Sequence, residues 1–180
     1  TAKAFAKKHG AEFIYTDLKE LAESSDIDAV YIASPNSYHC EQAVEMLKHG
    51  KHVLCEKPAA SNAAELQRMR AAAENGQAVL LEAMRSVYDP GFQAIEANLY
   101  RLGKIRSVSF RFCQYSSRYD NFRKGIIENA FRPELSNGAL MDIGVYCVHP
   151  LVRLFGMPEK IEGASVFLEN GVDGMGTILA

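Results

Sequence analysis

Short apolar runs alternate with helical patterns in the first half of the chain, and this alternation restricts the fold more than any other feature. The apolar runs lie at residues 28–34, 53–55 and 78–83, and the helical patterns lie between them at 38–49 and about 62–75. Strands that alternate with helices of this length predict βαβ units and a parallel sheet. Right-handed crossovers place the carboxyl ends of such strands on one edge. The segments expected to meet at that edge are 34–36, 56–58 and 82–85.

The other elements follow from local signals. A helix over residues 1–9 is expected to stop at Gly10, a short strand is expected at Phe13–Tyr15, and Thr16 is expected to cap the next helix. The pattern then changes after Arg85. The elements expected beyond it are a helix at 90–102, an alternating strand at 105–115, a loop at 116–134, a helix at 139–155, and strands at 160–168 and 175–180 around Asn170-Gly171.

This change of pattern predicts two domains. Residues 1–85 are expected to form a partial Rossmann-type parallel sheet of α/β class. Residues 86–180 are expected to form part of an α+β domain with a large, mainly antiparallel sheet. A chain of 180 residues is long enough for two modest domains.

Composition removes several functional classes. The formal net charge is −2, so no broad basic surface for nucleic acid is expected. No apolar run approaches the ~20 residues of a membrane helix, so no membrane partner is expected. The four cysteines lie at positions 40, 55, 113 and 147 without metal-type spacing, which fits a reducing cytoplasm.

The stretch His52–Pro58 carries the first candidate chemistry. Val53, Leu54 and Cys55 form a run that suits a strand buried on both faces. Lys57 follows at the ligand-binding edge of the sheet, and Pro58 biases it toward an extended backbone. An ammonium held beside Glu56 could donate a proton or polarise a carbonyl. The alternative reading of the same residues is a surface ion pair at a strand end.

The late helix carries the second candidate group. Asp142, Tyr146 and His149 have i, i+4, i+7 spacing and share one face of an otherwise apolar helix. Pro150 is expected to kink or break that helix. The stripe is either a solvated face or one side of a cleft opposite Lys57. In the cleft reading, Asp142 holds a substrate hydroxyl and Tyr146 takes or relays its proton.

Together these motifs resemble the glucose–fructose oxidoreductase/inositol dehydrogenase (Gfo/Idh/MocA) family. The resemblance rests on Ser-Pro-Asn at 34–36 with Tyr38-His39, Glu-Lys-Pro at 56–58, and Asn-Gly-Ala-Leu-Met-Asp-Ile-Gly-Val-Tyr at 137–146. It implies hydride transfer between NAD or NADP and a hydroxyl-bearing carbon of a sugar, polyol or related diol. Tyr146 stands where the family often has histidine, as in its glucose–fructose oxidoreductase and dihydrodiol dehydrogenase branches.

The resemblance also implies residue roles. Lys57 and Asp142 match the family's catalytic and substrate-positioning groups, with Tyr146 as their partner. Ser34, Pro35, Asn36 and His39 match the segment along the nicotinamide ribose, and Glu56 matches the residue beside the ribose hydroxyls. Glu82 and Arg85 also lie at the expected sheet edge. We predict that Glu82 contacts the cofactor and that Arg85 binds the substrate. His149 joins the substrate side, and no metal ligand is expected.

Family members open with a strand and a GxGxxG turn, which this sequence does not contain. An internal fragment of a longer enzyme is therefore expected, with weak cofactor binding and no useful turnover alone. The family's second sheet also implies a homodimer or homotetramer. The alternative function is a non-catalytic regulatory protein that binds a dinucleotide or sugar. A metal hydrolase is disfavoured because His49 and His52 should diverge. A Schiff-base role for Lys57 is disfavoured by Glu56 beside it.

Overall fold

The computed structural model describes residues 2–180, so Thr1 of the first expected helix lies outside the described residues. It contains two compact units. The first unit comprises residues 2–34 and Tyr38–Glu82, and the second comprises Pro35–Ser37 and Ala83–Ala180. Each unit is described by itself.

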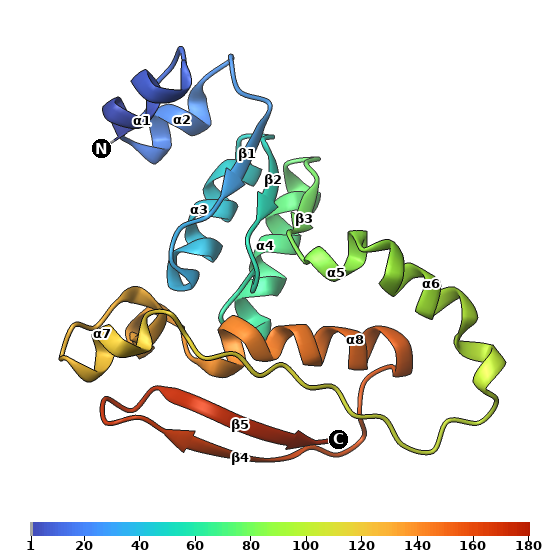
Figure 1. Cartoon of the computed structure of the whole chain (residues 1–180). Helices are drawn as coiled ribbons and strands as arrows, with labels where there is room; N and C mark the ends of the chain where they lie inside the picture. Colours follow the sequence, from blue (N-terminus) through green and yellow to red (C-terminus); the bar gives the residue numbers. More distant parts are fainter. Residues whose placement is uncertain (1) are drawn as a thin grey trace. The chain divides into compact units, whose positions relative to one another are not determined.

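A parallel sheet forms the centre of the first unit, as the alternation predicted (Figure 1). Its strands are β1 (Ala29–Ile32), β2 (His52–Cys55) and β3 (Leu80–Glu82), in that order. Val30 pairs with Val53, and Val53 pairs with Leu80. The connecting helices are α3 (Asn36–Lys48) and α4 (Ala63–Asn75), and two shorter helices precede the sheet, α1 (Ala2–His9) and α2 (Leu18–Glu23).

The core of the first unit lies on one face of this sheet. Val53 and Cys55 are buried there with residues of both connecting helices, among them Met46 and Met69. Leu54 points away from that core and is 37% exposed. The expectation that β2 is buried on both faces is therefore wrong. Because α3 and α4 both cover the same face, the alternating side chains of β2 have different environments.

Two predicted strands are not strands. Within residues 2–180, neither 13–15 nor 105–115 is paired in a sheet. Apolar side chains alone do not make a strand, because its backbone groups need a hydrogen-bonded neighbour. The cap of α2 was also misplaced by one residue. Asp17, rather than Thr16, accepts the N–H groups of Lys19 and Glu20.

The second unit begins with helices and short turns. The elements are α5 (Arg85–Tyr88), α6 (Pro90–Asn98), η1 (Leu99–Leu102), α7 (Tyr119–Arg123), η2 (Asn129–Phe131) and η3 (Pro133–Leu135). Helices α5 and α7 were not predicted. The rings of Tyr119, Phe122 and Phe131 pack together with centroid distances of 5.0–6.0 Å. This aromatic cluster gives the supposed loop at 116–134 a small core of its own.

The late helix and the final hairpin match the prediction more closely. A π-helical turn, η4 (Leu140–Gly144), continues into α8 (Val145–Phe155), which runs through Pro150. The irregular turn therefore lies ahead of the proline and not at it, which corrects the expected break. Strands β4 (Glu162–Phe167) and β5 (Asp173–Leu179) pair antiparallel, as predicted (Figure 1).

The stretch Pro133–Phe155 also bears on the membrane prediction. Of the helical stretches within residues 2–180, this 23-residue stretch, with mean hydropathy 1.3, passes a length and composition test for a membrane span. The expectation that nothing approaches that length was therefore too strict. Core helices of globular proteins pass the same test, so it is weak support for a membrane span.

Candidate active site

The turn after β2 is held by a network around Glu56. One carboxylate oxygen of Glu56 accepts a hydrogen bond from the Tyr31 hydroxyl of β1, and the other accepts the Lys57 backbone N–H at 3.1 Å. The hydrogen bond to Glu56 raises the pKa of the Tyr31 hydroxyl, so the phenol stays protonated as the donor. The Glu56 carboxylate is therefore fixed at the carboxyl edge of the sheet, directly before Lys57.

Tyr31 is a residue that the sequence reasoning missed. Its neighbour Ile32 is buried, whereas Tyr31 is 56% exposed on the opposite face. A tyrosine on the outer face of an apolar strand, at the end where ligands bind, was the available signal. The Glu56 backbone N–H also bonds to the Ile32 carbonyl at 2.8 Å, which extends the β1–β2 pairing to this turn.

His39 ties together the turns that follow β1 and β2. It is completely buried, and its ring nitrogens lie 2.8 Å from the Ser34 carbonyl oxygen and 2.9 Å from the Pro58 carbonyl oxygen. The Ser34 hydroxyl donates to Gln42 at 2.7 Å. Both side chains are thus engaged with the protein itself. Their expected contact with a cofactor stays a prediction. In the structure, the hydrogen bonds of these two side chains hold the turns after β1 and β2 in place.

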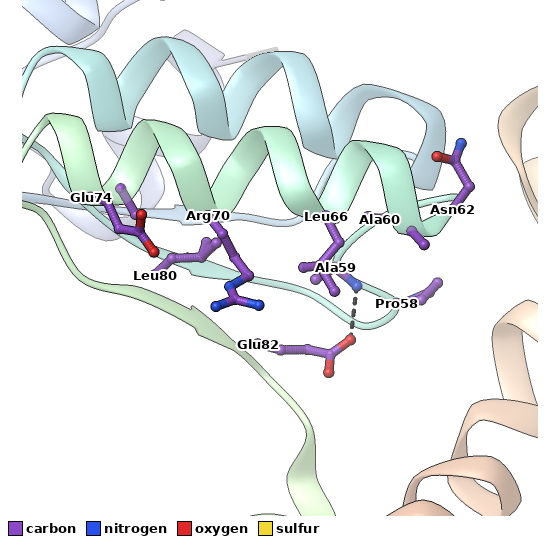
Figure 2. A pocket seen from close by; sticks show the side chains of 11 residues that line it. Pro58, Ala59, Ala60, Asn62, Leu66, Arg70, Glu74, Leu80 and Glu82 are labelled. Carbon is purple, nitrogen blue, oxygen red and sulfur yellow. Dashed lines mark hydrogen bonds between the residues drawn. The ribbon is translucent and has the colours of Figure 1, made fainter. Parts of the chain in front are cut away.

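Glu82 and Cys55 also support the turn that follows β2. At the end of β3, Glu82 accepts the Ala59 backbone N–H at 2.8 Å (Figure 2). Cys55 lies beneath the turn with no exposed surface, and burial raises the pKa of its thiol to about 12. The Cys55 thiol is therefore neutral and acts as a small core residue. Within this turn, the Lys57-Pro58 peptide bond is cis.

A cavity of about 520 Å³ opens on the helix side of this turn. Its lining combines residues 58–60 with α4 and the end of β3, and Arg70 extends from α4 into it (Figure 2). Glu82 is the predicted site residue that lines it. The other residues expected in the site lie outside this lining.

Asn36 belongs to the second unit although its flanking residues 34 and 38 belong to the first. Its buried side-chain amide donates to the Ser136 carbonyl and to the Asn137 side chain, both at 2.9 Å. The Asn137 side chain in turn donates to the Asn129 carbonyl at 2.9 Å. The amide nitrogen of Asn36 is thus committed to the loop ahead of the late helix.

The late helix presents Asp142, Tyr146 and His149, each in a different environment. Asp142 lies on the π-helical turn, and its N–H bonds to the Gly138 carbonyl at 2.9 Å. The Tyr146 ring stacks on Phe112 with centroids 5.4 Å apart and planes at 19°. Because a π turn contains more residues than an α turn, the simple i, i+4 relation assumed between Asp142 and Tyr146 does not hold strictly.

His149 is held by residues that the sequence reasoning did not select. Its Nδ1 lies 3.2 Å from the Ser86 hydroxyl, and its ring centroid lies 5.9 Å from that of Phe92. The signals present were a hydroxyl at Ser86, directly after Arg85, and an aromatic residue, Phe92, within the helix expected at 90–102. Arg85 itself is exposed at the start of α5. Its substrate role remains a prediction, as does the convergence of Lys57 with Asp142 and Tyr146.

The described groups suit proton transfer and hydroxyl recognition. A carboxylate and a phenol lie on one helix of the second unit, and Lys57, whose backbone N–H bonds to the Glu56 carboxylate, lies at the sheet edge of the first. Carboxylates accept hydroxyl hydrogens, and phenols exchange protons with them. In the described part of the chain, no cluster of three or more His, Cys, Asp or Glu side chains is placed to hold a metal ion.

Comparison with known proteins gives matches along almost the whole chain. Residues 1–84 match the model "Oxidoreductase family, NAD-binding Rossmann fold", and residues 94–180 match the model "GFO/IDH/MocA C-terminal domain". The scyllo-inositol 2-dehydrogenase (NADP(+)) of Bacillus subtilis (strain 168) is 52% identical over 178 residues, 99% of this chain and 54% of that protein.

A more distant relative and a solved structure also match the chain over nearly its whole length. The trans-1,2-dihydrobenzene-1,2-diol dehydrogenase of Xenopus tropicalis is 34% identical, over 96% of this chain and 51% of that protein. The structure of the WlbA dehydrogenase from Bordetella pertussis, in complex with NADH and UDP-GlcNAcA, superimposes with a TM-score of 0.77 at 22% identity. That likeness covers 99% of this chain and 55% of that one. The chain spans about half the length of the curated relatives it matches.

Proposed function

Because the chain belongs to the Gfo/Idh/MocA oxidoreductase family, we propose that it contributes the catalytic segment of an NAD(P)-dependent dehydrogenase. The proposed reaction moves a hydride between the nicotinamide and a hydroxyl-bearing carbon of a polyol, sugar or related diol. The 52% identity to an inositol dehydrogenase, over a span that includes every predicted site residue, carries this proposal. The same relative favours NADP as the cofactor and an inositol as the first substrate to test.

The residues at the sheet edge fit the cofactor. Tyr31 and the Lys57 N–H occupy one lone pair on each Glu56 oxygen, so further lone pairs of this fixed carboxylate are able to accept ribose hydroxyls. Ser34, Pro35, Asn36, His39 and Glu82 shape the surrounding turns. When bound, the nicotinamide supplies or accepts the hydride.

The proton steps are assigned to three side chains of this chain. Tyr146 exchanges the proton of the reacting hydroxyl, and stacking on Phe112 restricts its ring. Lys57 stabilises negative charge on the same oxygen. Asp142 accepts a hydrogen bond from a neighbouring hydroxyl and so orients the substrate. Arg85 and His149 are assigned to the rest of the substrate.

The wider setting is also a proposal. Residues 1–85 and 86–180 are assigned to a cofactor domain and a substrate domain. The protein is proposed to act in the cytoplasm as a homodimer or homotetramer, with no nucleic acid or membrane as partner. The named relatives are dehydrogenases of an inositol and of a dihydrodiol, which supports a small-molecule polyol or diol as the partner.

The test is turnover by the protein expressed from its complete reading frame. NADP and NAD are offered separately with scyllo-inositol, myo-inositol and a trans-dihydrodiol, and reduced nicotinamide is followed by absorbance. Lys57→Met and Tyr146→Phe should each lower kcat by ~10²-fold or more. The matched controls are Lys48→Met in the last turn of α3 and Tyr100→Phe, whose side chain is 79% exposed. Cofactor binding without turnover would favour the regulatory alternative.

A further inference from the structure

The helical stretch that carries Asp142 begins without a cap of its own. The first N–H groups of any helix lack partners inside the helix. Side chains such as Ser, Thr, Asp or Asn usually satisfy one of them from the position just before the helix. Here Gly138 and Ala139 occupy the start, and Ala139 provides no side-chain hydrogen bond. An acceptor from elsewhere in the chain can therefore satisfy one of these N–H groups in place of water.

Asp173, the first residue of β5, provides that acceptor. Its Oδ2 accepts the Leu140 backbone N–H at 2.7 Å, across 33 residues of sequence. The bond is short because the acceptor is charged, and the carboxylate lies at the positive end of the helix. A residue outside the helix therefore fixes the turn on which Asp142 lies.

Gly138 leaves room for this contact. A Cβ at residue 138 would lie 1.8 Å from Asp173 Oδ1, which is far inside any permitted approach. The φ angle of Gly138 is +143°, a conformation that side-chain-bearing residues rarely adopt. The carbonyl of Gly138 also accepts the Asp142 N–H at 2.9 Å. Asp173, Gly138 and Asp142 thus form one connected chain of contacts.

The turn that precedes Asp173 is itself anchored by hydrogen bonds and by burial. The turn before it is closed by the Leu168 N–H, which bonds to the Val172 carbonyl at 2.8 Å. Val172 is 2% exposed, and the Asn170 side chain donates to the Phe131 carbonyl at 2.6 Å. The carboxylate is therefore presented from an anchored hairpin end.

We propose that Asp173 is a positioning residue for the reaction: its carboxylate, accommodated by Gly138, sets the place of the helical turn that carries Asp142. This inference rests on the proposed function, because it assigns Asp142 to the substrate. Asp173 does not touch the substrate. Its effect passes through Leu140 and Gly138 to the orientation of the Asp142 carboxylate.

Kinetics on the protein from its complete reading frame separate positioning from mere stability. Asp173→Ala should lower kcat/KM for the polyol by about 10- to 100-fold, raise the polyol KM and leave the cofactor KM within about twofold. Asp173→Asn should recover most of the loss, since its amide oxygen still accepts the Leu140 N–H. Glu169→Ala removes an exposed carboxylate from the same turn and should match wild type. A loss in kcat with both KM values unchanged indicates fewer folded molecules and overturns the proposal.

A double-mutant cycle tests the contact with Gly138. Gly138→Ala forces the Asp173 carboxylate aside and should resemble Asp173→Ala. In the Asp173→Ala background the same change should cost less, because the obstructing oxygen is gone. Fully additive losses would contradict the proposed coupling.

Hydrogen exchange gives an outcome that does not depend on activity. The peptide containing residues 139–143 should exchange at least about tenfold faster in Asp173→Ala than in wild type, and Asp173→Asn should be intermediate. Unchanged exchange overturns the proposal even if the enzyme is active. Faster exchange together with a wild type that turns over no polyol or diol shows that Asp173 holds the turn and that the proposed function is the part that fails.

Discussion

Replacing His39 by leucine tests whether one buried side chain holds the candidate cofactor edge together. Leucine has a similar volume to histidine, so the change removes the ring nitrogens with little added cavity. The Ser34 and Pro58 carbonyl oxygens, 2.8 and 2.9 Å from those nitrogens, then lose their partner. A neutral imidazole has a single N–H, so at least one true hydrogen bond is lost.

The expected cost follows from the burial of this site. His39 has no exposed surface, so water does not replace the lost donor. An unsatisfied buried acceptor costs about 1–3 kcal/mol of the free energy of unfolding. With a urea dependence of about 1–3 kcal/mol per M, the unfolding midpoint should fall by roughly 1 M.

The assay is urea unfolding followed by circular dichroism, with cofactor affinity measured on the folded protein. His39→Gln keeps an amide donor and should lose less stability than His39→Leu. The control is His49→Leu, because His49 is exposed and bonds to the Glu45 carbonyl at 2.9 Å where water is available. A midpoint for His39→Leu equal to that of the control would refute the reasoning.

Two further predictions concern the first unit. Burial keeps the pKa of the Cys55 thiol near 12, above its ordinary value of 9.0, so the unfolded chain releases this proton first as the pH rises. The free energy of unfolding should therefore fall between about pH 9 and 12, less steeply in Cys55→Ala, as pH-dependent urea titrations would show. Gly76→Ala should destabilise by about 1–3 kcal/mol, because its Cβ would lie 1.9 Å from the Leu47 carbonyl oxygen. A thermal midpoint equal to wild type would contradict that packing.

Sequence patterns predicted the elements whose signals are local. The apolar runs at β1, β2 and β3 and the helices between them follow from periodicity. In the structure, the Asn62 side chain caps α4 by accepting the Glu65 N–H at 3.0 Å. The final hairpin follows from its turn at Asn170-Gly171. These elements depend on neighbours close in sequence, so they can be predicted without knowledge of the fold.

Other features depend on partners distant in sequence. The alternating run at 105–115 looks like a strand, but no described neighbour pairs with its backbone. The π turn at Leu140–Gly144 and its cap by Asp173 involve residues 33 positions apart. The link between Tyr31 and Glu56 spans 25 positions and forms only once β1 and β2 are in register. No local pattern encodes such pairings.

The three-residue excursion at Pro35–Ser37 has a consequence for any attempt to divide this protein. A protease cut or an expression boundary near residue 86 leaves Asn36 on the amino-terminal piece, while the Ser136 and Asn137 groups that it bonds stay on the other. The carboxyl-terminal piece made alone would expose that loop to water. Nicking the intact protein should instead give two pieces that copurify until denaturant is added.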